Sequence, residues 1–137
     1  MKAVVITEYG SNDVVHLVDI DKPSPGAGEV LVKVHAAGVN PIDWKIRGGA
    51  GERMGMTLPI RLGGEFVGTI EALGPGVHSF GHGEAVFGMV HTGAFAEYTL
   101  AKADNIVRKP SGLDFIQAAA PPLAGTTAWQ ALFDEAG

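Results

Sequence analysis

The sequence predicts a mainly β fold, a small barrel or sandwich with short helices and a helical C-terminal tail. Twenty of the 137 residues are glycine, roughly twice the usual share of about 7%, which favours many tight turns. Short β-branched or alternating runs lie between these turn residues as far as Pro110. Beyond Pro110 the pattern changes to alanine-rich, helix-like segments. Many short strands followed by helices indicate one such domain with a helical tail.

The strands are predicted from β-branched residues and from apolar alternation between turn signals. The clearest is 29–37, where valine occupies positions 30, 32 and 34 on one face and Leu31 falls on the other. Prolines and glycines in 21–28 and 74–76 mark the loops between strands. The expected strands cover residues 2–7, 14–20, 29–37, 66–73, 83–89, 95–103 and 106–109.

One short helix is expected within the strand-rich part, over residues 40–47. Asn40 suits its N-cap, Pro41 its first helical position and Asp43 its first turn, where the helix dipole favours an anion. Gly48 and Gly49 are expected to end it. The following polar, glycine-rich residues 48–61 are expected to form a mobile loop, of which residues 48–55 cover a substrate or are disordered.

The C-terminal segment predicts two helical pieces. The first covers 114–120 with Asp114 as its cap, and Pro121 and Pro122 are expected to break it. The second covers 126–135, with Thr126 or Thr127 as cap, and precedes Gly137. Its apolar residues surround most of the helix, so it must be buried on more than one side. It docks either on the barrel or on a further domain, and composition leaves both open.

Composition excludes several classes of function. Ten Lys and Arg against fifteen Asp and Glu give a net charge of −5, and no basic block offers a nucleic-acid surface. No apolar run approaches the roughly 18 residues that span a bilayer, and no signal peptide is evident. We therefore expect a cytoplasmic protein. Cysteine is absent, which removes disulfides, thiolate nucleophiles and cysteine-based zinc sites.

Five segments together resemble the medium-chain dehydrogenase/reductase superfamily. They are MKAVVITEYG, EVLVKVHAAGVNPIDWKIRGG, LPIRLGGEFVGTIEALGPGV, GAFAEYTLAKADNIVRKPSGL and the tail AAAPPLAGTTAWQAL. The likeness is greatest to its zinc-independent quinone oxidoreductases and enone reductases. It implies a GroES-like, partly open β-barrel over 1–110 as the catalytic domain. Residues 111–137 would lead into a nucleotide-binding domain, whose G-x-G-x-x-G fingerprint has no strand–turn–helix context in this sequence.

The resemblance implies NADPH-dependent hydride transfer to a small-molecule quinone or α,β-unsaturated carbonyl. Because the nucleotide-binding domain would be absent, we expect this chain alone to be inactive and to bind no NADPH tightly. We also expect the apolar tail to be buried by self-association, as a homo-oligomer, or to rearrange. The rival functions are a non-catalytic GroES-like interaction module and a zinc alcohol dehydrogenase-like enzyme.

Zinc alcohol dehydrogenases share the implied scaffold, but their metal ligands are replaced in this sequence. Asn40 stands where they have a cysteine, Gly64 where they have a histidine, and the residues near Leu123 where they have a second cysteine. Tetrahedral zinc needs three or four imidazole, thiolate or carboxylate ligands that converge. No metal site is therefore expected.

The resemblance also points to four site residues, each with a simpler alternative. The amide of Asn40 would donate to the nicotinamide ribose or to the substrate carbonyl, or the residue would only cap its helix. Lys45 would face cofactor and substrate as a catalytic cation, or be solvated. Thr127 would contact the nicotinamide, or only begin a helix, and Trp44 would line the substrate site, or belong to the core. Glu65 is expected to organise nearby backbone rather than transfer protons.

Overall fold

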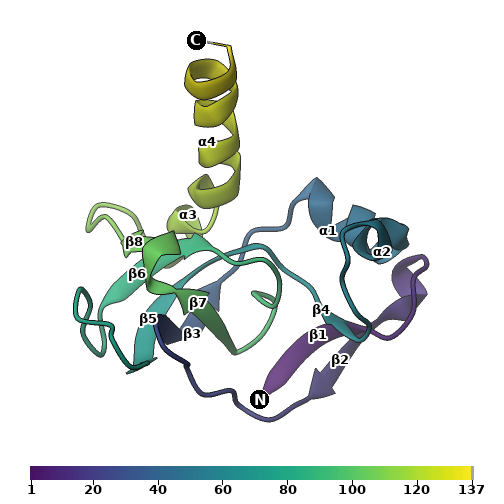
Figure 1. Cartoon of the computed structure of the whole chain (residues 1–137), viewed down its shortest axis with the longest axis horizontal. Helices are drawn as coiled ribbons and strands as arrows, with labels where there is room; N and C mark the ends of the chain where they lie inside the picture. The colour runs from purple at the N-terminus through teal and green to yellow at the C-terminus, as the bar shows by residue number, and fades with distance from the viewer. Residues whose placement is uncertain (137) are drawn as a thin grey trace.

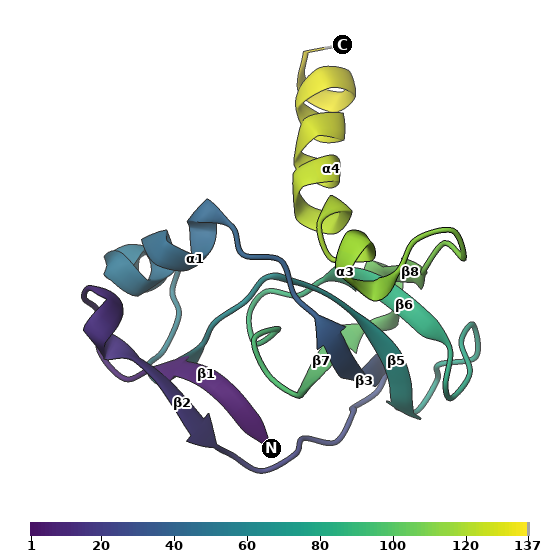
Figure 2. The same ribbon diagram turned by 180° about the vertical axis from the view of Figure 1, so that it is seen from behind.

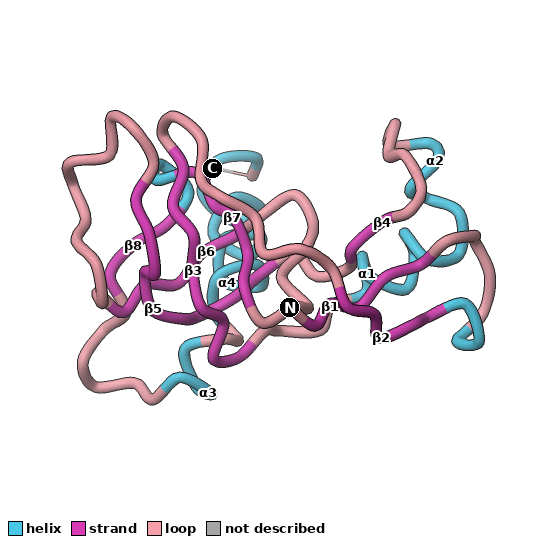
Figure 3. The backbone as a smooth tube through the Cα atoms, turned by 90° about the horizontal axis from the view of Figure 1, so that it is seen from below, coloured by secondary structure: helices cyan, strands magenta, loops and turns pink. Residues whose placement is uncertain are grey.

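A computed structural model describes residues 1–136, and it contains two antiparallel sheets that lie side by side (Figure 3). The smaller sheet has the strand order β2-β1-β4, made of β1 (Lys2–Ile6), β2 (Val15–Asp19) and β4 (Ile60–Arg61). The larger has the order β7-β3-β5-β6-β8, made of β3 (Glu29–Ala36), β5 (Glu65–Leu73), β6 (Ala85–Met89), β7 (Tyr98–Lys102) and β8 (Ile106–Arg108). The larger sheet curls, so the expected mainly β, partly open barrel is confirmed (Figure 1).

The segment just before β7 joins the two sheets. The Val4 N–H donates to the Phe95 carbonyl at 2.8 Å, and the Glu97 N–H donates to the Lys2 carbonyl at 3.0 Å. On its other side the Glu97 carbonyl accepts from the Val34 N–H at 2.9 Å. One short piece of extended chain therefore bonds β1 and β3 at once, and this closes the wall of the barrel between the sheets.

The core has two main parts, one in each half of the barrel. The larger sheet encloses Val30, Val32, Phe66, Ile70, Val77, Val86, Ala94, Ala101 and Ile106. The smaller sheet covers Ile6, Val14, Ile46, Ile60 and Leu62. The predicted valine face of β3 lies in the first part, but Leu31 on the opposite face is also buried. The middle of β3 is thus buried on both faces, and β5 and β7 pair with its two edges.

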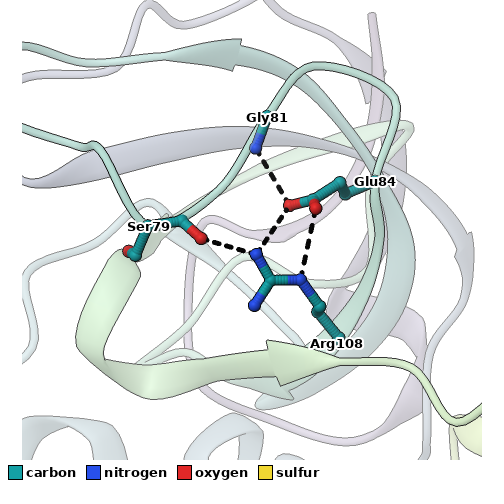
Figure 4. A network of polar contacts seen from close by, with 4 residues as sticks. All are labelled: Ser79, Gly81, Glu84 and Arg108. Carbon is teal, nitrogen blue, oxygen red and sulfur yellow. Dashed lines mark hydrogen bonds and ion pairs between the residues drawn. The ribbon is translucent and has the colours of Figure 1, made fainter.

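An arginine–glutamate network fixes the loop between β5 and β6 (Figure 4). Arg108 on β8 donates to Glu84 at 3.2 Å and to the Ser79 carbonyl at 2.6 Å. Glu84 also accepts from the Gly81 N–H at 2.9 Å. The Gly81 bond, with help from Arg108, holds the pKa of Glu84 below its usual value. This glycine-containing loop is therefore held against the edge strand β8.

The predicted central helix is present, but it does not end at the glycine pair. α1 (Pro41–Lys45) continues through a π-helical turn (Ile46–Ala50) into α2 (Gly51–Arg53). Gly49 has φ 122°, and the helix kinks there instead of ending. The expectation of a mobile loop over 48–61 is therefore wrong, because α2 and β4 both lie within it. Short 3-10 turns occupy Asn12–Val14 and Ala103–Asn105.

The C-terminal helices begin differently from the prediction. α3 (Phe115–Ala118) has the expected cap, since Asp114 accepts from the Gln117 N–H at 2.7 Å. α4 (Pro121–Trp129) begins at Pro121 itself. A proline suits the first position of a helix, because the backbone N–H that it lacks would have no partner within the helix there. Pro121 and Pro122 therefore start a helix rather than only ending one, and the predicted threonine caps are wrong. Further helical turns follow over Gln130–Glu135, and Gly137 lies outside the described residues.

α4 rises away from both sheets, with its C-terminal end farthest from the barrel (Figures 1 and 2). Its exposed apolar side chains are Trp129, Leu132 and Phe133. Of the two expected positions for this helix, docking on the barrel is not what is observed. In residues 1–136, no helix combines the length and the apolar character that crossing a bilayer requires.

Candidate functional site

Asn40 lies at the N-cap of α1, half-buried, as predicted. Its backbone N–H donates to the Asp43 carboxylate at 2.8 Å, and its carbonyl accepts from the Asp43 N–H at 3.0 Å. Its side chain does something different, because the amide nitrogen donates to Glu65 at 2.6 Å. The residue thus begins the helix through its backbone and bonds β5 through its side chain.

Glu65 is the acceptor of that bond and is only 2% exposed. Its second oxygen accepts from the backbone N–H of Leu123 in α4 at 2.7 Å. A Cβ on Gly38 would lie 2.0 Å from the first oxygen, so only glycine lets the chain pass so close. The expectation that Glu65 organises nearby backbone is confirmed, since one carboxylate joins β5, the start of α1 and the start of α4.

Asp43 is the other buried carboxylate near this point, 6% exposed on α1. Burial raises its pKa, while hydrogen bonds from the backbone of Asn40 and Gly63 act in the opposite direction. Asp43 forms no ion pair with Arg47, four residues further along. Arg47 instead donates to the Gly10 carbonyl at 3.2 Å and to the Asn12 side chain. Asp43 therefore serves the backbone around it.

A small cavity of about 160 Å³ lies between α1 and the start of α4. Asp43 lines it from α1, Leu123 from α4, and Gly63 and Gly64 from the chain before β5. Met54, which belongs to the predicted loop, contributes as well. The remaining lining residues are Ile42, Ile46, Met89, Val90, His91 and Thr92. The cavity thus lies where four separate parts of the sequence meet: 42–54, 63–64, 89–92 and Leu123.

The other predicted site residues do not line this cavity. Trp44 is 56% exposed, so its alternative as a core residue is wrong. Lys45 is exposed, with its ammonium 5.7 Å from the centre of the Trp44 ring. Thr127 lies within α4, one turn beyond Leu123, and is exposed to solvent. The structure therefore joins Asn40 to the start of α4 and leaves Trp44, Lys45 and Thr127 accessible at the surface.

A larger groove of about 630 Å³ was not anticipated from the sequence. It lies between α4 and the strands β6 and β8, and its lining is mostly apolar: Phe87, Gly88, Met89, Val90, Asp104, Asn105, Val107, Pro121, Pro122, Gly125, Thr126 and Trp129. No spacing in the sequence signals this groove, because it exists only through the direction in which α4 leaves the barrel. The apolar tail was the one available indication.

The positions that bear zinc ligands in zinc alcohol dehydrogenases come close together in this fold. Gly64 and Leu123 line the small cavity, and Asn40 and Leu123 both donate hydrogen bonds to Glu65. An amide, a glycine and a leucine supply no ligand that tetrahedral zinc prefers. Within residues 1–136, no three His, Cys, Asp or Glu side chains are grouped so that they could hold a metal ion.

The side chains present fit one end of a nicotinamide dinucleotide. Asn40 uses its amide nitrogen on Glu65, which leaves its oxygen for a ribose hydroxyl or a carboxamide N–H. Lys45 and Thr127 offer exposed donors. The diphosphate end needs a glycine-rich turn between a strand and a helix, and the part of the chain that the structure describes has none. The donor set therefore fits the nicotinamide end alone.

The chain matches one family model and has similar relatives among known proteins. The family model described as the alcohol dehydrogenase GroES-like domain matches residues 26–111. Human quinone oxidoreductase is 40% identical over 138 residues, covering 99% of this chain and 42% of that protein. The chain thus spans less than half the length of this curated relative.

Solved structures agree with the fold. A quinone oxidoreductase from Coxiella burnetii superposes with a TM-score of 0.92 at 40% identity, over 98% of this chain and 44% of that one. The quinone oxidoreductase of Escherichia coli, solved in complex with NADPH, gives a TM-score of 0.92 at 29% identity, over 98% of this chain and 41% of that one. The expected GroES-like barrel is confirmed by these likenesses.

Proposed function

Because the chain belongs to the alcohol dehydrogenase GroES-like domain family, within the medium-chain dehydrogenase/reductase superfamily, we propose that it forms the catalytic-domain portion of an oxidoreductase. The reaction is NADPH-dependent reduction of quinones or α,β-unsaturated carbonyls. The names of the human and Coxiella relatives support the substrate class, and the Escherichia coli complex supports the cofactor. Residues 1–110 form the catalytic barrel, and residues 111–137 lead toward a nucleotide-binding domain outside this chain.

The observation that carries the proposal is the held amide of Asn40. Its nitrogen is bound to a buried carboxylate, so its oxygen is directed elsewhere and has a fixed orientation. A fixed polar group orients a ligand better than a freely rotating one. Asn40 is therefore the residue whose oxygen accepts from a ribose hydroxyl or from the nicotinamide carboxamide, with Thr127 as a second contact from α4.

Lys45 is proposed as the catalytic cation. When NADPH is bound it supplies the hydride. Reduction of a quinone or an enone builds negative charge on the carbonyl oxygen of the substrate. The exposed ammonium of Lys45, at the last residue of α1, is able to stabilise this charge as it develops. Trp44 beside it offers an aromatic face to a flat substrate.

The proposed enzyme is independent of zinc. Support comes from the side chains at Asn40, Gly64 and Leu123, which place no thiolate or imidazole where the zinc-dependent relatives have their ligands. Polarisation of the substrate carbonyl then depends on side-chain donors rather than on a metal. Lys45 is the proposed donor for this polarisation, because it is the cation nearest in sequence to Asn40.

A chimeric enzyme tests the proposal. The 137 residues replace the matching part of the Coxiella burnetii quinone oxidoreductase, and NADPH-dependent reduction of 1,4-benzoquinone is followed by absorbance. We expect turnover from the chimera and none from the 137-residue chain alone. Lys45→Ala should lower kcat by about 100-fold, as loss of an aimed electrostatic donor does. Asn40→Ala should raise the KM for NADPH by up to about tenfold.

Lys33→Ala is the matched control, since Lys33 is an exposed lysine on β3. It should leave both constants unchanged. A folded chimera that binds NADPH but reduces neither a quinone nor an enone would contradict the proposal and favour a non-catalytic module. Stoichiometric zinc in an active chimera would contradict the metal-independent part.

A further inference from the structure

Glu65 is a buried charge without a cation. It is 2% exposed at the start of β5, and the ion pairs among residues 1–136 leave it out. Burying a carboxylate is unfavourable unless hydrogen bonds compensate for its lost water. It has two such bonds, from the Asn40 amide at 2.6 Å and the Leu123 N–H at 2.7 Å.

The second bond supplies what α4 lacks at its start. The N-cap residue of α4 is Ala120, whose side chain has no acceptor. Pro121 and Pro122 have no N–H, so Leu123 is the first residue of the helix with a backbone hydrogen to donate. Glu65, 58 residues earlier in the sequence, accepts that hydrogen at the positive end of the helix dipole. A side chain of the barrel thus caps α4.

The first bond fixes the Asn40 amide. A carboxylate only accepts hydrogen bonds, so the nitrogen of the amide must face Glu65 and the oxygen must face away. Without this partner the half-buried amide would be free to turn over. The orientation of the Asn40 oxygen and the attachment of α4 therefore depend on the same side chain.

We propose that Glu65 is a positioning residue that sets Asn40 and α4 relative to each other. This inference rests on the proposed function for its purpose: Thr127 lies one turn beyond Leu123, so Glu65 relates both proposed cofactor contacts to one point of the barrel. Glu65 itself touches no reacting atom. Its role is to keep two elements in register that are far apart in the sequence.

A swap of hydrogen-bond polarity tests the inference in the 137-residue chain. Glu65→Gln leaves one acceptor and adds one donor, so either the Leu123 N–H faces a donor, or the Asn40 amide must turn over and Leu123 keeps only a neutral, weaker acceptor. Adding Asn40→Asp restores both bonds: the glutamine amide donates to the new aspartate and still accepts from Leu123. Hydrogen exchange of the Leu123 amide, followed by NMR, should be at least about tenfold faster in Glu65→Gln. The double variant should return it close to the wild-type rate.

The Asn40 side-chain NH2 signals give a readout that general loss of stability does not move. In wild type these NH2 hydrogens should exchange slowly with solvent. In Glu65→Gln their chemical shifts should change, or they should exchange as fast as those of a solvated amide. Glu71→Gln is the matched control, a carboxylate on the same strand that pairs with Lys22. It should leave the Leu123 and Asn40 signals unchanged.

The outcomes separate this inference from the proposed function. Unchanged Leu123 exchange and Asn40 signals in Glu65→Gln would overturn it, whatever the chimera does in an enzyme assay. If Glu65→Gln does not fold, the double variant decides: recovered folding supports the inference, and no recovery overturns it. An inactive chimera combined with restored exchange in the double variant would remove the cofactor contacts and leave the positioning role intact.

Discussion

At the scale of single residues, the two buried carboxylates near α1 are both held by hydrogen bonds, but from different groups. Glu65 receives two strong hydrogen bonds from neutral groups. Asp43 receives backbone bonds, yet burial still dominates and raises its pKa. The sequence predicted that Glu65 would organise nearby backbone and that Asp43 would lie in the first turn of a helix. It could not anticipate their partners, because Leu123 and Gly63 meet them only after the barrel has formed.

The raised pKa of Asp43 predicts a definite pH dependence of stability. Its folded pKa lies above the unfolded value of 3.8, so the protonated form is favoured by folding. Its contribution to stability is therefore full below pH 3.8 and is lost as the pH rises through the folded pKa. Asp43→Asn cannot titrate, so its free energy of unfolding relative to wild type should fall as the pH is lowered from 7 toward 4.

Urea unfolding of both proteins at each pH measures this difference, and groups common to both cancel. Asp104→Asn, an exposed carboxylate outside α1, is the control and should show no such trend. A gap between wild type and Asp43→Asn that is constant over this range, or that shifts in favour of the variant on acidification, would contradict the assignment.

At the scale of elements, the closest approach of two strands depends on Gly68. It pairs with Val34 where the register between β3 and β5 shifts. A Cβ at this position would lie 2.0 Å from the Lys33 carbonyl oxygen and 2.7 Å from a methyl group of Val32. Backbone cannot move aside as a flexible side chain can. We therefore expect Gly68→Ala to lower the free energy of unfolding by about 1–3 kcal/mol, measured by urea denaturation.

Gly48→Ala is the matched control, because a Cβ there meets no atom within 4 Å. Alanine also suits helical backbone better than glycine, so a gain of up to about 1 kcal/mol is expected. Equal effects of the two substitutions would show that the spacing of β3 and β5 tolerates a methyl group. The close pairing would then not explain why a glycine stands at this position.

Elements were predictable where a local signal decides them and less so where packing does. Alternation and turn residues located most strands to within a few residues, and the Asp114 cap was right in detail. The glycine pair at Gly48 and Gly49 misled, because the Ile46 side chain is buried in the core and holds the helical path past them. The pair at Pro121 and Pro122 misled because a carboxylate from β5 completes the helix start. Neither partner is visible from local sequence.

At the scale of the whole molecule, the chain consists of a closed body and an exposed arm. The barrel has a core of its own, although Leu17, Val39, Trp44 and Val107 lie exposed on it. The arm, α4 and the turns after it, exposes Trp129, Leu132 and Phe133 within five residues of one another. Trp129 and Phe133 contact each other across one helical turn, with ring centres 4.5 Å apart. The sequence predicted that this helix needs a partner surface, since its apolar residues were visible. It did not predict the groove beside the helix, which arises from tertiary direction alone.

The exposed arm predicts that the purified chain associates with itself. Contiguous apolar surface of this kind is normally covered in soluble proteins, and within residues 1–136 the arm points away from both sheets (Figure 2). Sedimentation should therefore show a mass that rises with protein concentration. Leu132→Glu together with Phe133→Glu should abolish that rise, because burying two carboxylates costs more than the apolar contact returns. Ile116→Glu, at an isolated exposed position on α3, should leave it intact. A wild-type chain that sediments as a monomer at every concentration would contradict the prediction, because the apolar arm would then remain exposed to solvent without self-association.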